Sequence, residues 1–113
     1  MAESGFYKVE FSAQLPGAGG IVILDDGTVR GGDGQYLYSG TFEETPSGVV
    51  ASIRVRAASA SAKSVFGSAG GSFDLSLSGT SDANNFRITG PSPFPGGAGI
   101  TISGTRLAGL DLK

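Results

Sequence analysis

Residues 20–33, with the sequence GIVILDDGTVRGGD, decide the expected fold of this chain. The apolar run Ile21-Val22-Ile23-Leu24 has glycine before it and the pair Asp26-Gly27 soon after it. An Asp-Gly pair between two such runs is a strong signal for the two-residue turn of a β-hairpin. The chain is therefore expected to return as a second strand through Thr28-Val29-Arg30, until the glycines that follow interrupt it.

The same pattern of short alternating runs separated by turn residues continues along the chain. In the first run Tyr7, Val9 and Phe11 alternate with polar side chains, which is the period of a strand with one buried face. Pro46-Ser47-Gly48 marks a further turn. About eight strands are expected. The nine short runs that could form them are residues 7–13, 21–24, 28–30, 36–42, 49–55, 73–78, 86–88, 100–102 and 107–112, and the last two are expected as the strands that close the chain.

Eight antiparallel strands of this length favour closure into a barrel, because closure removes exposed strand edges. At 113 residues the chain fits one domain, residues 1–113. The expected fold class is therefore all-β, an eight-stranded antiparallel barrel, and a two-sheet sandwich is the main alternative. Residues 57–72 are rich in Ala, Ser and Gly and are expected to connect two strands, with room for one helical turn at residues 60–66.

The tripeptide Ser-Gly-Thr occurs three times, at residues 39–41, 78–80 and 103–105. Its unequal spacing does not indicate a repeat architecture. Glycine inside a strand marks a bend or a close approach of another backbone. We therefore expect the strands of a small barrel to bend at the three central glycines.

The composition excludes several classes of enzyme. The chain has no histidine and no cysteine, so nucleophile–histidine systems, thiolate zinc sites and histidine metal sites cannot form. Asp25 and Asp26 lack the spacing of a calcium loop, and the glycine clusters match no nucleotide-binding motif. We therefore expect no catalytic residue, no metal and no cofactor. The protein is expected to bind a partner or ligand without catalysing a reaction.

Charged residues are sparse and spread along the whole chain. Eight basic and ten acidic residues give a net charge of -2, and the densest basic pair is Arg54 and Arg56 on one face of a strand. Nucleic-acid binding needs clustered cations, so nucleic acid is not an expected partner. The first residues lack the pattern of a secretory signal, and no run approaches the ~18 apolar residues of a membrane helix. A cytoplasmic location without membrane contact is expected.

Most aromatic residues lie at the same alternate positions as the other apolar residues of their strands, so their side chains should face the barrel interior. The interior of an eight-stranded barrel is either filled by side chains or just wide enough for one small ligand. Many other interior positions hold Ala, Gly or Val, which leaves this choice open. A cavity for a small apolar ligand would be lined by Tyr7, Phe11, Tyr36, Tyr38 and Phe42.

Glu43 and Glu44 form an adjacent acidic pair at the end of a strand. Adjacent strand residues point to opposite faces, so the two carboxyls cannot act together as a general acid and base. As an acidic protrusion in solvent, the pair predicts a contact with a basic protein partner. A charged loop edge without a binding role is the alternative.

The stretch at residues 20–33, followed by Tyr38-Ser39-Gly40, resembles the GrlR family of bacterial negative regulators of type III secretion genes. The most specific part is the hairpin that ends in Gly31-Gly32-Asp33 with a Tyr and a Gly soon after. Residues 5–11, 64–66 and 75–88 are compatible with the family, so the similarity spans most of the chain.

The resemblance implies an eight-stranded, lipocalin-like barrel that forms a homodimer. In the best-known member it also implies inhibition of a transcriptional activator through an acidic surface motif, Glu-Asp-Glu-Asp. That motif falls near residues 43–46 here, where Glu43 and Glu44 match and Pro46 replaces an acid. The leading hypothesis is therefore a regulatory protein-binding module, and the alternative is a carrier or sensor of a small apolar ligand.

Overall fold

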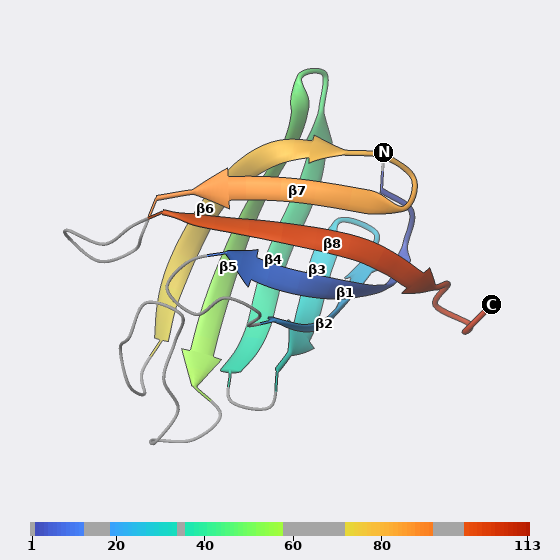
Figure 1. Cartoon of the computed structure of the whole chain (residues 1–113), viewed down its shortest axis with the longest axis horizontal. Helices are drawn as coiled ribbons and strands as arrows, with labels where there is room; N and C mark the ends of the chain where they lie inside the picture. The colour runs from blue at the N-terminus through green and yellow to red at the C-terminus, as the bar shows by residue number, and fades with distance from the viewer. Residues whose placement is uncertain (1, 13–18, 34–35, 58–71, 92–98) are drawn as a thin grey trace.

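The computed structural model describes residues 2–12, 19–33, 36–57, 72–91 and 99–113, which form a closed barrel of eight antiparallel strands (Figure 1). Each strand pairs with the next along the chain, and the last strand pairs with the first. The expected all-β barrel is confirmed, in place of the alternative sandwich. The strands are β1 (Gly5–Ser12), β2 (Gly19–Asp25), β3 (Thr28–Gly32), β4 (Tyr36–Thr45), β5 (Gly48–Ala57), β6 (Ser72–Ser81), β7 (Asn85–Gly90) and β8 (Ile100–Ala108).

The β2–β3 hairpin has the geometry that its sequence predicts. Asp26 and Gly27 occupy the two turn positions with φ values of 50° and 81°. Two positive φ values are typical of a type I′ turn, whose twist matches the twist of the flanking strands. The Thr28 hydroxyl donates to the Asp25 carbonyl oxygen at 2.6 Å, and these two residues pair across the turn. The turn thereby fixes the register of the hairpin.

Alternation along each strand separates an apolar interior from a polar outer surface. The pattern is regular in β5, where exposed residues alternate with the buried Val49, Ala51, Ile53 and Val55. Val55 lies opposite Tyr38 of β4 and Phe73 of β6, so side chains in register point to the same side. Buried residues from all eight strands meet in one hydrophobic core.

The three Ser-Gly-Thr glycines lie where a neighbour leaves no room for a side chain. A Cβ atom on Gly40 would collide with the backbone of Ser52 in β5, and one on Gly79 with the backbone of β7. A Cβ atom on Gly104 would collide with the ring of Phe86. The structure therefore accounts for these glycines by close approach of a backbone or a ring.

The two ends of the barrel differ in their connections. Tight turns follow β2, β4 and β6 at one end, which we call the turn end (Figure 1). The N-terminal segment lies at this end, where the Glu3 amide donates to the Ala83 carbonyl oxygen at 3.2 Å. The strands β1, β3, β5 and β7 finish at the opposite end.

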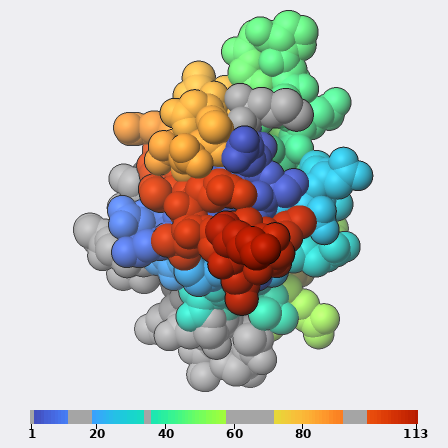
Figure 2. Space-filling view, turned by 90° about the vertical axis from the view of Figure 1, so that its right-hand side faces the viewer, coloured from blue at the N-terminus to red at the C-terminus, as the bar shows by residue number. Residues whose placement is uncertain are grey.

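The prediction of a separate last strand at residues 107–112 is wrong. A single strand, β8, covers Ile100–Ala108, and it pairs with both β1 and β7. Beyond it, the Leu112 amide donates to the Gly109 carbonyl and the Gly109 amide to the Lys113 carbonyl, both at 2.8 Å, so that a turn follows β8. These C-terminal residues, dark red in Figure 2, lie on the side of the molecule that faces the viewer there. Every described strand already has two neighbours, so no edge is left for another strand.

The expected helical turn at residues 60–66 lies outside the described residues. Within the described ranges, no helix has the length and apolar character that crossing a membrane requires.

Replacing Gly104 by Ala is expected to lower the free energy of unfolding by about 1–3 kcal/mol. The added methyl group overlaps the Phe86 ring, which is held between Tyr7 and Phe42 at centroid distances of 5.5 and 5.2 Å. Urea denaturation measures the change. The exposed neighbour Ser103, replaced by Ala, is the control and should shift stability by less than about 0.5 kcal/mol. Equal stability of the two variants would contradict this packing.

Candidate functional site

The side chains predicted to line an interior cavity all point into the barrel and are buried: Tyr7, Phe11, Tyr36, Tyr38 and Phe42. Their rings contact one another or other aromatic rings. The ring centroids of Phe11 and Tyr38 lie 5.6 Å apart in an edge-to-face arrangement, and Phe42 meets Phe86 in the same way. A ligand at this place would have to displace packed rings, and its presence stays a prediction.

The hydroxyl groups of two interior tyrosines are bonded near opposite ends of the barrel. At the turn end, the Tyr7 hydroxyl donates to the Glu3 carbonyl oxygen at 2.6 Å. Near the other end, the Tyr38 hydroxyl donates to Asp33 Oδ2 at 2.6 Å, while Asp33 Oδ1 accepts the Tyr36 amide at 2.8 Å. Burial raises the pKa of both phenols, and the Asp33 carboxylate raises that of Tyr38 further. Both hydroxyls therefore remain donors at neutral pH.

Glu43 and Glu44 have different surroundings, as their opposite directions on β4 require. Glu44 Oε1 accepts the Ala2 amide at 2.9 Å, and both of its carboxylate oxygens lie 2.9 Å from the Ser81 hydroxyl. Glu44 therefore links the N-terminal segment, β4 and β6 at the turn end. Glu43 is exposed and is the member of the pair that faces solvent.

The outward residues of β4, β5 and β6 form a surface that we call the outer wall. It carries two adjoining grooves of about 510 and 410 Å³, which share Thr41 and Ser52. The register arranges its side chains in four cross-strand rows, which from the turn end are Glu43–Val50–Ser78, Thr41–Ser52–Ser76, Ser39–Arg54–Asp74 and Leu37–Arg56–Ser72.

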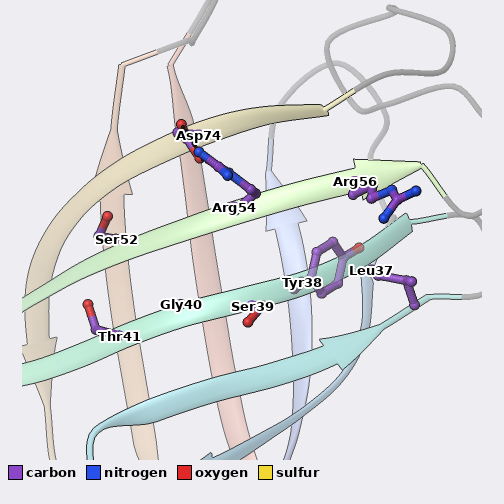
Figure 3. A pocket seen from close by; sticks show the side chains of 9 residues that line it. All are labelled: Leu37, Tyr38, Ser39, Gly40, Thr41, Ser52, Arg54, Arg56 and Asp74. Atoms are coloured by element: carbon purple, nitrogen blue, oxygen red, sulfur yellow. Dashed lines mark hydrogen bonds and ion pairs between the residues drawn. The ribbon is translucent and has the colours of Figure 1, made fainter.

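Small hydroxyl side chains occupy the middle of the outer wall, and larger side chains stand at its ends. Leu37 and Val50 expose 54% and 44% of their surface. Figure 3 shows Leu37 and Arg56 at one end of the larger groove, away from Thr41 and Ser52. The outer wall therefore offers apolar, hydroxyl and charged groups to a ligand at the same time.

One ion pair crosses the outer wall. Arg54 Nε donates to Asp74 Oδ1 at 2.9 Å, and Arg54 Nη2 donates to Asp74 Oδ2 at 3.3 Å (Figure 3). This bidentate bond lowers the pKa of Asp74 and raises that of Arg54. Arg56 lies two residues further along β5 and is exposed.

The outer wall suits binding through ion pairs, hydrogen bonds and apolar contact. In the described part of the chain, no three acidic side chains gather where they could hold a metal ion. Reasoning from the sequence identified Glu43 and noted the Arg54–Arg56 pair, but it missed Leu37 and Val50. Both are apolar residues at strand positions whose side chains point outward, and this is the signal in the sequence that could have identified them.

Neither a scan against protein-family models nor a search of curated proteins finds a match to this chain. The resemblance to the GrlR family therefore rests on the sequence pattern of residues 20–33 and 38–40. The geometry of the outer wall is the main ground for a functional interpretation.

Replacing Glu44 by Ala is expected to lower the free energy of unfolding by about 1–3 kcal/mol, because a carboxylate that accepts two hydrogen bonds is lost. The same replacement at Glu43, which is solvent-exposed, should change it by less than about 0.5 kcal/mol. Urea denaturation of both variants provides the comparison. If Glu43→Ala lowers the free energy of unfolding as much as Glu44→Ala does, the two residues do not have separate roles.

Proposed function

We propose that this chain is a non-enzymatic regulatory module that binds a partner protein through the outer wall. The observation that carries the proposal is the exposure of Leu37 and Val50 at the two ends of a wall with adjoining grooves. Single exposed apolar side chains are common on protein surfaces. Leu37 and Val50 differ in that grooves and charged or hydroxyl side chains lie between them, and protein interfaces combine apolar contact with polar groups in this way. The barrel interior, in contrast, holds aromatic rings in mutual contact.

The β4–β5 hairpin carries one end of this surface away from the barrel. It extends beyond the other strands at the turn end (Figure 1). Glu43 and Val50 lie opposite each other near its tip. An exposed carboxylate beside an apolar side chain favours a basic group with an apolar neighbour on the partner. This supports the acidic contact that the GrlR resemblance implies. In this chain one outward glutamate, Glu43, would make that contact.

The resemblance supports the remaining parts of the proposal, namely a cytoplasmic homodimer whose partner is a regulatory protein. Nucleic acid is not the proposed ligand, because Glu43 and Asp74 place negative charge on the same wall as the arginines.

Charge reversal at Glu43 tests the protein-binding function. Tagged wild-type protein should retain a partner from a lysate of its own host, and Glu43→Lys should lower the retained amount about tenfold, as expected for one lost ion pair with added repulsion. Glu10→Lys makes the same charge change at an exposed position on β1 and should retain the partner fully. The proposal fails if no protein is retained, or if both variants retain it equally.

Native mass spectrometry distinguishes this proposal from the alternative, a carrier or sensor of a small apolar ligand. Protein purified from its own host is expected to have the mass of an empty dimer, since the interior rings are already packed. A lipid-sized additional mass would instead support the carrier function. A monomer at every concentration would remove the homodimer from the proposal.

A further inference from the structure

Three arginines gather on the outer surface at the end of β4 and β5 away from the turn end. Arg30 of β3 and Arg54 of β5 flank Ser39 of β4 in one row, and Arg56 follows in the next row beside Leu37. Neighbouring strands lie about 4.8 Å apart, so the backbones of Arg30 and Arg54 are separated by about 10 Å. Three of the eight basic residues of a net negative chain thus share one small surface, which we call the basic end.

The three guanidinium groups differ in what they already bind. Arg54 is bound to Asp74 through two hydrogen bonds. Arg30 and Arg56 are exposed, and neither forms an ion pair with another described residue. A planar guanidinium matches a carboxylate in a bidentate manner, and the Arg54–Asp74 pair shows this geometry on the same wall. The basic end is therefore suited to receive a further carboxylate.

We infer that the basic end binds an extended acidic segment of the partner protein. A carboxylate of the segment pairs with Arg56 or Arg30, and an apolar side chain beside it packs on Leu37. The inference rests on the proposed function, because the occupant is the partner and the outer wall is its binding surface. It adds that the partner carries acidic and apolar side chains on one face of the same segment.

The composition of the wall favours a protein segment over a polyanion. Lipid surfaces and nucleic acids draw their affinity from many clustered cations. Here one of three guanidinium groups is already neutralised by Asp74, and Glu43 adds negative charge at the other end of the wall. Leu37, 54% exposed, offers an apolar contact that a phosphate backbone would not use.

A synthetic peptide tests the inference directly. In an extended peptide of sequence (Glu-Glu-Leu-Leu)₂ each face alternates acidic and apolar side chains, because side chains alternate with period two. Fluorescence anisotropy of the labelled peptide should show at least about tenfold tighter binding than (Lys-Lys-Leu-Leu)₂, in which every charge is reversed, or (Glu-Glu-Ser-Ser)₂, which has no apolar side chain. Binding should weaken as salt is added, since the arginines are exposed.

Three variants locate the peptide on the wall. Arg56→Glu should weaken binding about tenfold, whereas Arg87→Glu makes the same charge change at an exposed position on β7 and should leave it unchanged. Asp74→Asn releases Arg54 and should tighten binding about threefold. A variant that merely fails to fold cannot produce this gain.

The inference is overturned if the peptide does not bind, or if Arg56→Glu binds it as tightly as wild type. It is equally overturned if Asp74→Asn gives no gain, or if phosphatidylserine vesicles bind in place of the peptide. Capture of the host partner separates this inference from the proposed function. Capture that depends on Glu43 but not on Arg56 removes the acidic segment and leaves the binding function. Capture that does not depend on Glu43 removes the proposed function and, with it, this inference.

Discussion

The two-residue period of side chains in a closed ring of strands is the constraint on which the rest of this structure depends. Because every described strand pairs on both sides, each residue points either into the core or towards solvent, and a shift by one residue would exchange the two sets. Closure also leaves no free strand edge among the described strands, so no partner can bind by adding a strand. Contact with a protein partner is therefore left to outward side chains, the turns and the ends of the barrel.

The same constraint lets one strand contribute both to stability and to the proposed binding surface. On β4, Glu44 holds the N-terminal segment and Ser81, while its neighbour Glu43 faces solvent. Tyr38 likewise points inward to a core ring and to Asp33, while the adjacent Leu37 stands on the outer wall. Neighbours in sequence thus belong to different parts of the molecule, and the residues of the outer wall come from different strands.

Local features of the fold could be predicted, because turn geometry and side-chain period are properties of a few consecutive residues. Asp26-Gly27 and the alternation of β5 are examples. Residues 107–112 show the limit: the sequence predicts a separate strand there, but the first two residues belong to β8 and the rest find no unpaired edge once β8 lies between β1 and β7. The outer wall depends on the same kind of non-local information. The row that contains Ser39, Arg54 and Asp74 exists only through the register of three strands.

The pairing of β1 with β8 also affects how the protein is made. Synthesis proceeds from the N-terminus, so β1 emerges from the ribosome first and its partner β8 emerges last. Until then the growing sheet has open edges at β1 and β7, with unpaired amide and carbonyl groups. The nascent chain is therefore vulnerable to aggregation until β8 has left the ribosome and paired with β1 and β7. A chain cut short before residues 100–108 would have open edges at β1 and β7 that can pair with other chains.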